Sequence, residues 1–115
     1  MTAPNLTALT SVTAESDQWA ATNTITTRIT VASNTAVIVK AIRATNIHAA
    51  TAGWITAIVD RSGTDYRIAY QVTIPINAQI EVLEKLLVLE EGDLLQLQAN
   101  ASSNVETEVS YFILT

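Results

Sequence analysis

The strongest strand signals of this chain lie in residues 74–100, which read IPINAQIEVLEKLLVLEEGDLLQLQAN. Two apolar runs, residues 80–89 and 94–99, flank the polar tetrapeptide EEGD. Short apolar runs bounded by turn residues are typical of buried strands. A short helix over residues 83–89 is the alternative, but helices usually need ten or more residues. We therefore predict consecutive strands that pack into one core, with Gly92 at positive φ in the turn between them.

Strand signals continue on both sides of this stretch. Residues 24–32 alternate between apolar and polar positions, and residues 105–114 do the same. Alternation with period two is typical of a half-buried strand. Residues 36–47 also read as a long strand, but both of its faces are partly apolar, so its register is ambiguous from the sequence.

Turn residues separate these segments at the short intervals of a two-sheet protein. Gly63 in the segment RSGT predicts a hairpin turn, and Pro75 should end the strand before it because proline lacks a main-chain donor. We predict an all-β fold, a single antiparallel β-sandwich of the jelly-roll or immunoglobulin-like type with about seven to nine short strands. Its core should include Leu95, Leu97 and Val109.

The length of 115 residues suits one domain. We assign residues 1–23 to an N-terminal arm and loop, and residues 24–115 to the β-sandwich domain. Within residues 1–23, residues 2–14 are predicted to be an extended arm or an edge strand, with the strand preferred, and residues 15–23 to form a loop. Trp19 is the only large apolar side chain of that loop. We expect it to plug the end of the core rather than to bind a ligand.

The composition argues against several classes of partner. The net charge is −5, and the six basic residues are scattered along the chain, so nucleic acid is not an expected partner. No apolar run reaches the roughly 18 residues expected of a membrane span, so no membrane is expected either. No signal peptide is visible at the start of the chain. The absence of cysteine excludes disulfides and thiolate chemistry.

No set of residues in the sequence points to catalysis. His48 is the only histidine, and it lies in an Ala- and Thr-rich segment without a nucleophile elbow. A solvated loop residue is therefore the favoured interpretation. Phosphate-binding loops, dinucleotide fingerprints and zinc-protease motifs do not occur in the sequence. Tyr66 and Tyr70 share one face of a predicted strand, which indicates sheet packing more often than a sugar-binding platform.

Acidic residues gather around the central turn of the 74–100 stretch. The cluster consists of Glu84, Glu90, Glu91 and Asp93, and its spacing does not match a calcium-binding loop, so we predict that residues 90–93 form a solvated turn. We expect no enzyme activity, no catalytic residue, no cofactor and no metal. Chelators should accordingly change neither fold nor assembly.

The last predicted strand carries the candidate subunit interface. Phe112 and Leu114 share a strand face with Glu106 and Glu108, so this face changes from polar to apolar toward the end of the chain. The opposite face of the strand is expected to fill the core. Phe112 and Leu114 therefore need another surface to cover them, and a neighbouring subunit would do so. Folding of residues 2–14 over the same face is the alternative.

The chain resembles the small β-sandwich virion structural proteins of tailed bacteriophages, which include capsid decoration (cement) proteins and head or tail accessory proteins. The likeness spans residues 24–114. It is carried by Ala44-Thr45-Asn46, by Ile74-Pro75 followed by Ala78, by the segment LVLEEGD at residues 87–93 and by LQANAS at residues 97–102.

This resemblance implies a non-enzymatic virion protein, made in the host bacterial cytoplasm, that stabilises a phage particle as a capsid decoration protein. The implied partners are further copies of the chain, with a homotrimer as the expected form, and the major capsid protein or other virion proteins. A head–tail, neck or tail-fibre accessory protein is the alternative within the family. A carbohydrate- or receptor-binding module is the rival class, and a small hydrolase is a third.

Overall fold

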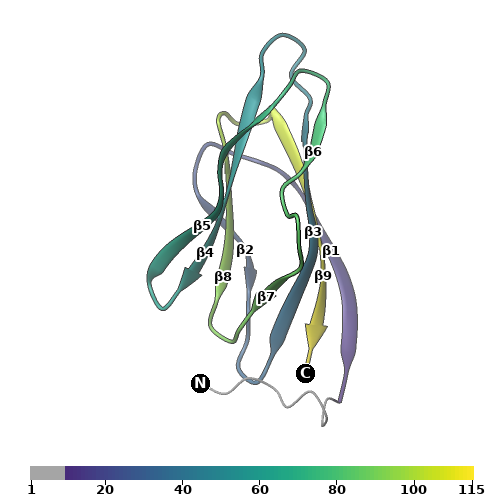
Figure 1. Cartoon of the computed structure of the whole chain (residues 1–115), viewed down its shortest axis with the longest axis vertical. Helices are drawn as coiled ribbons and strands as arrows, with labels where there is room; N and C mark the ends of the chain where they lie inside the picture. Colours follow the sequence, from purple (N-terminus) through teal and green to yellow (C-terminus); the bar gives the residue numbers. More distant parts are fainter. Residues whose placement is uncertain (1–9) are drawn as a thin grey trace.

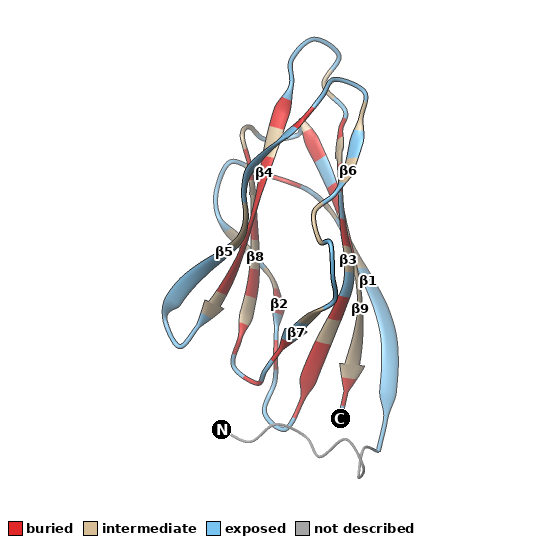
Figure 2. Ribbon diagram, viewed as in Figure 1, coloured by how far each residue is buried: buried red, intermediate tan, exposed pale blue. Residues whose placement is uncertain are grey.

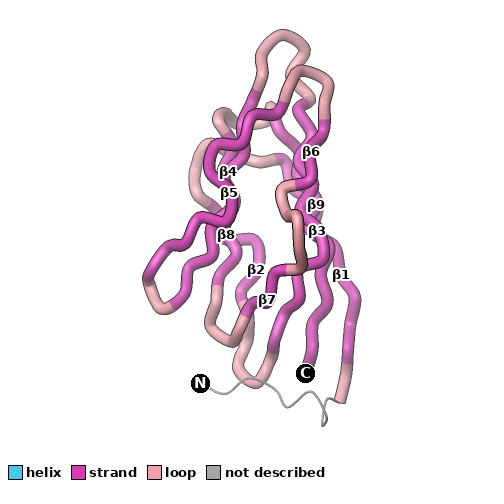
Figure 3. The backbone as a smooth tube through the Cα atoms, in the orientation of Figure 1, coloured by secondary structure: helices cyan, strands magenta, loops and turns pink. Residues whose placement is uncertain are grey.

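Two antiparallel sheets pack face to face in the computed structural model, which describes residues 10–115 (Figures 1 and 3). Nine strands and no helix occur in this part of the chain. The predicted all-β sandwich is therefore confirmed. Branched apolar residues supply most of the buried side chains, as expected of strands that pack on two sides of one core.

Each sheet has its own set of strands. The β9 sheet has the order β1-β9-β3-β6, and β7 also pairs with β3. Its strands are β1 (Val12–Ala20), β3 (Ala36–Asn46), β6 (Gln79–Glu81), β7 (Leu87–Leu89) and β9 (Val105–Leu114). The β8 sheet has the order β2-β8-β4-β5. Its strands are β2 (Thr26–Thr30), β4 (Gly53–Arg61), β5 (Thr64–Ile74) and β8 (Leu94–Ala99).

The connections between these strands make a jelly roll. β6 and β7 pair with two different parts of β3, so together they occupy one strand position in the β9 sheet. The chain crosses between the sheets at each connection except the β4–β5 hairpin and the step from β6 to β7. Two four-position sheets joined by such crossings form the jelly-roll arrangement. Of the two predicted sandwich types, the structure therefore has the jelly roll.

The core lies between the sheets and contains the predicted residues (Figure 2). Leu95, Leu97 and Val109 are fully buried. A bulge in β3 between Val39 and Ala41 explains the ambiguous pattern of that segment. Because a bulge adds one residue, the inward face changes from odd to even positions along the strand. On the inward face, the buried residues of β3 are accordingly Val37 and Val39 before the bulge, then Ile42, Ala44 and Asn46 after it, while Ala36 is buried at the start of the strand.

The predicted loop over residues 15–23 is wrong for residues 15–20, and only residues 21–23 lie outside a strand. β1 extends through Ala20 and pairs with β9 along its whole length. Residues 15–20 show no strand pattern because β1 is an edge strand whose side chains are mostly exposed, so apolar and polar residues need not alternate. Trp19 lies on β1, and its partly buried ring packs against both clusters of the core. The part of the predicted arm before residue 10 lies outside the described residues.

The central stretch also differs in detail from its prediction. The helix considered for residues 83–89 does not form, and β7 begins at Leu87 instead. The two apolar runs lie in opposite sheets, since β7 pairs with β3 and β8 pairs with β4. They still contribute to one core, as predicted. Gly92 has φ 84°, which confirms the positive value expected for the turn between them.

Candidate interaction surface

The outer face of the β9 sheet carries the two candidate interface residues. β9 lies between β1 and β3, and Phe112 pairs with Ala14 on one side and with Ile38 on the other. Ile38 pairs in turn with Val88 of β7. Directly paired residues of antiparallel strands share a face, so a line of apolar side chains crosses the whole sheet. We call this line the apolar row, and it consists of Ala14, Phe112, Ile38 and Val88.

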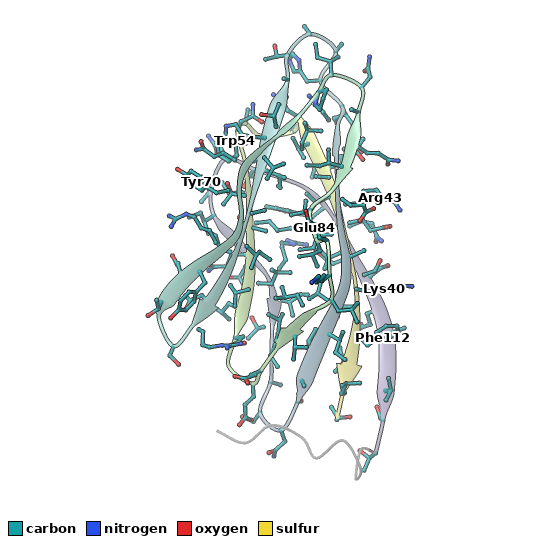
Figure 4. The ribbon with its side chains drawn as sticks, in the orientation of Figure 1. Lys40, Arg43, Trp54, Tyr70, Glu84 and Phe112 are labelled. Carbon is teal, nitrogen blue, oxygen red and sulfur yellow. The ribbon has the colours of Figure 1, made fainter. Side chains whose placement is uncertain are left out.

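The apolar row keeps part of its surface exposed. Val88 is 56% exposed, and Phe112 and Ile38 are half-buried. Phe112 projects from the sheet on the side away from the core (Figure 4). Leu114 lies on the same strand face and pairs with the exposed Val12, but it is only 8% exposed itself. The structure therefore brings Phe112 and Leu114 onto one face, and Leu114 has little surface left for a partner.

Polar residues occupy the other end of the same face. One paired line across the sheet consists of Gln18, Glu108, Arg43 and Glu81. Within it, Gln18 Nε2 donates to Glu108 Oε2 at 3.2 Å, and Arg43 Nε donates to Glu81 Oε1 at 3.4 Å. An open hollow of about 480 Å³ lies over this end. Lys40, the extra residue of the β3 bulge, projects on the same side as Arg43 and Phe112 (Figure 4).

Sequence reasoning missed Ile38 and Val88 as members of this surface. Because of the bulge after Val39, both faces of this segment look partly apolar in the sequence, so the sequence did not show whether Ile38 points inward or outward. Val88 lies within the unbroken apolar run LLVL, where no alternation distinguishes the inner from the outer face. The change from polar to apolar along β9 was the signal that the sequence did provide.

The acidic turn between β7 and β8 is solvated only in part, so its prediction is wrong for Glu91 and Asp93. Glu84 and Glu90 are exposed, but Glu91 is 8% exposed and Asp93 only 2%. Arg61 donates from Nε to Asp93 Oδ1 at 3.0 Å and from Nη2 to Oδ2 at 2.6 Å. Glu91 Oε2 accepts a hydrogen bond from Asn34 N at 2.6 Å, while its Oε1 is buried without a partner among the described residues. Glu91 and Asp93 are buried because the turn crosses from one sheet to the other over the end of the core, whereas Glu90 and Gly92 are exposed.

The environment of Asp93 shifts its acid–base equilibrium. Burial by itself would raise the pKa of this carboxyl group. The hydrogen bonds from Arg61 and from the main-chain nitrogen of Glu90, together with the charge of Arg61, outweigh burial and lower the pKa below its ordinary value. Asp93 therefore serves as an ionised structural anchor that holds the ends of β4 and β8 together.

His48 stabilises the loop between β3 and β4. Its Nδ1 accepts hydrogen bonds from the main-chain nitrogens of Ala50 and Thr51, both at 3.1 Å. The buried Asn46 donates to Thr51 O and Ile74 O, and its Oδ1 accepts from His48 N. The imidazole is therefore engaged with the main chain of its own loop. This arrangement gives His48 a role in local structure that the prediction of a solvated loop residue did not include.

The two tyrosines of β5 do not pack on the sheet as predicted. Tyr66 is 57% exposed and Tyr70 is 60% exposed. Irregularities in the β4–β5 pairing interrupt the alternation between them. The guanidinium of Arg67 lies 5.2 Å from the ring centre of Tyr70, whereas Arg67 and Tyr66 are adjacent and point to opposite faces. Tyr66 and Tyr70 therefore lie on different faces. Tyr70 and Trp54 both project on the side opposite to Phe112 (Figure 4).

Within residues 10–115, no group of three His, Asp or Glu side chains is arranged so that it could hold a metal ion. In the same residues, no helix is long and apolar enough to cross a membrane. Comparisons with protein-family models, with curated proteins and with solved structures found no match to this chain.

Proposed function

We propose that this chain is a non-enzymatic virion structural protein of a tailed bacteriophage, and specifically a capsid decoration protein. The observation that carries the proposal is the apolar row on the outer face of the β9 sheet. A solvent-facing line of apolar side chains that spans several neighbouring strands is unusual on a protein that acts alone, and it marks an interaction surface. The resemblance of residues 24–114 to phage virion proteins supplies the biological setting.

The fold is compatible with this role but does not select it. Jelly rolls form viral capsid domains, and they also form lectin domains. Fold-level analogy therefore supports both a virion role and a binding role, and the choice must come from the surface. The apolar row favours protein–protein contact, because sugar sites combine polar groups with an exposed aromatic face, whereas this row is wholly apolar.

The proposed occupant of the apolar row is another copy of the chain, with a homotrimer as the expected assembly. The row lies at one end of the face and adjoins a polar half that carries Arg43 together with Glu81 and Glu108, so the face combines an apolar part with a charged part. Such a division is typical of subunit interfaces. The major capsid protein or another virion protein would then bind the assembled oligomer rather than the single chain.

Replacing Phe112 with aspartate tests the subunit contact. Phe112→Asp places a charge in the apolar row, so copies of the chain should no longer associate through this face, while each chain stays folded. Thr45→Asp is a matched control, because Thr45 pairs within the polar half of the same face. Sedimentation velocity would measure the assembly, and thermal unfolding would show whether each variant folds. A wild-type chain that remains monomeric at high concentration would contradict the oligomer.

Particle composition tests the virion role itself. Purified particles of the phage that encodes the chain should contain it, and stoichiometry distinguishes its place. A copy number comparable with that of the major capsid protein indicates decoration of the shell. A single ring of copies indicates a neck or tail position. Absence from the particle would contradict the virion role.

A carbohydrate-binding module remains the second candidate, because Tyr70 is largely exposed and lies on the same side of the β8 sheet as Trp54. Aromatic rings can stack on sugars, and Arg67 beside Tyr70 could add a polar contact. Two results together would favour this function over the first. The chain would bind glycans on an array and lose this binding in Tyr70→Ala, and purified phage particles would not contain the chain.

A further inference from the structure

The outer edge of the β8 sheet has a second surface suited to contact between copies of the chain. β5 is the last strand in the order β2-β8-β4-β5, and β4 is its only hydrogen-bonded neighbour among the described strands. All four residues of its first part, 64–67, are exposed. The β4–β5 hairpin projects away from the body of the sandwich at the lower left of Figure 1. An exposed edge of this kind can accept another strand.

The hairpin geometry shows which main-chain groups point to the open edge. Ser62 and Gly63 have φ values of 56° and 82°, as in a two-residue type I′ turn, and Arg61 pairs with Thr64 across it. The pair that closes such a turn is hydrogen-bonded, and hydrogen-bonded pairs alternate with non-hydrogen-bonded pairs along the hairpin. Tyr66 therefore directs its N–H and C=O toward β4. Asp65 and Arg67 direct theirs toward the open edge.

We propose that two copies of the chain pair β5 with β5, antiparallel and about a two-fold axis at Tyr66. In this register Asp65 of each copy lies opposite Arg67 of the other, and the two residues exchange the main-chain hydrogen bonds that the edge offers. The same pairing places two Asp–Arg ion pairs on one face of the joined sheet. On the other face, the two Tyr66 side chains meet at the axis as a non-hydrogen-bonded pair, where side chains lie closest.

The charge pattern makes this contact specific to β5. β1 is the other long edge strand, and the same operation about its Ser16 would place Glu15 opposite Asp17, which is a second carboxylate and already pairs with Arg28 of its own chain at 2.8 Å, so no ion pair between copies would form. The charges and irregularities of β5 also discourage pairing with unrelated strands. A second copy in the stated register is the partner for which Asp65 and Arg67 become attractive.

This contact is independent of the proposed virion role, because it lies on the β8 sheet and does not involve the apolar row. The two surfaces can therefore be tested separately. A protein with both contacts would form larger assemblies than either contact gives alone, since one contact links copies through the β9 sheet and the other joins copies edge to edge.

Charge reversal is the first test, performed in the Phe112→Asp background so that the apolar row does not contribute. Arg67→Asp places like charges opposite each other and should weaken self-association by about tenfold or more. The double variant Asp65→Arg/Arg67→Asp exchanges the charges, restores both ion pairs and should restore association. Sedimentation velocity over a range of concentrations measures each step. Unchanged association in Arg67→Asp, or no recovery in the double variant, would overturn the proposal.

Cross-linking tests the register directly, because the natural chain contains no cysteine. Tyr66→Cys places two cysteines opposite each other at the axis, where the Cα separation permits a disulfide. Asp65→Cys is the matched control, because the two copies of position 65 would be diagonal neighbours about 7–8 Å apart, beyond disulfide reach. Under mild oxidation, Tyr66→Cys should form a covalent dimer and Asp65→Cys should not. Equal cross-linking of both variants, or of neither, would contradict the two-fold register.

Discussion

The two glycine turns of the molecule use similar residues and have opposite surroundings. The β4–β5 hairpin turns at Ser62 and Gly63, and the β7–β8 connection turns at Gly92. Gly63 and Gly92 have nearly equal φ values of 82° and 84°. Each turn also has an aspartate that accepts a main-chain hydrogen bond. Asp60 accepts from Gly63 N at an exposed site, whereas Asp93 accepts from Glu90 N and is buried.

The connection that each turn makes explains this difference. The hairpin joins neighbouring strands of one sheet, so its turn extends into solvent beyond the sheet. The β7–β8 turn joins opposite sheets and therefore covers the end of the core. There it also binds the β2–β3 connection, because Gly92 N donates to Val31 O and Val31 N donates to Asp93 O. Local sequence sets the conformation of a turn, and the topology around it sets whether its side chains are buried.

The largest expected effect concerns the core that the β7–β8 turn covers. Leu97→Ala should lower the free energy of unfolding by about 2–5 kcal/mol, because it removes buried apolar surface and leaves a cavity. Leu86→Ala makes the same chemical change at a side chain that is 63% exposed, so it should cost under about 0.5 kcal/mol. Urea denaturation of both variants gives the comparison. Equal losses would show that the assigned core is wrong.

Replacing the two turn aspartates separates the buried turn from the exposed one. Asp93→Ala should cost about 2–3 kcal/mol, because it removes hydrogen bonds to a buried carboxylate. The loss stays below that of a fully buried pair, since the Arg61 side chain is 45% exposed and regains water. Asp60→Ala removes one exposed hydrogen bond and should cost under about 1 kcal/mol. Denaturation midpoints of similar size for the two variants would refute the proposed difference between the turns.

Valine at the two glycines should show what the turns have in common. A β-branched residue is strained at positive φ, so Gly92→Val should cost more than about 1 kcal/mol. Gly63→Val should cost a similar amount, because its φ is nearly the same and no atom lies within 4 Å of an added Cβ. Thermal unfolding of the two variants tests this. An unchanged midpoint for either variant would show that its turn can adopt another conformation.

The sequence predicted the features that depend on local pattern. Alternation along residues 105–114 and the apolar run of residues 94–99 placed Val109, Leu95 and Leu97 correctly in the core. The tetrapeptide EEGD predicted the conformation of Gly92. For the candidate surface, the change of polarity along the last strand placed Phe112 on an outer face. Each of these inferences needs only neighbouring residues.

The features that the sequence did not predict depend on distant residues. The burial of Asp93 requires Arg61, which is 32 positions away in the chain. The apolar row requires knowing that Ile38 and Val88 lie beside Phe112 in one sheet. β1 forms a strand because β9 offers it a main-chain edge, although its own side chains are mostly exposed. These outcomes follow from strand order, which local periodicity does not contain.

The smallest expected effect is the acid dependence that Asp93 gives to stability. The pKa of Asp93 in the folded protein is lower than its ordinary value of 3.8, which the unfolded chain should retain. The unfolded state therefore binds a proton more readily, so the contribution of Asp93 to the free energy of unfolding is complete well above that value and is lost as pH falls through the folded pKa.

Asp93→Asn removes this titration while keeping the shape of the side chain. The difference in unfolding free energy between wild type and Asp93→Asn should be constant near about pH 6 and shrink below about pH 4. Because the other carboxylates titrate equally in both proteins, urea denaturation of the pair across this range isolates Asp93. A difference that stays constant down to the lowest pH, or that grows there, would show that Arg61 does not favour the ionised form of Asp93.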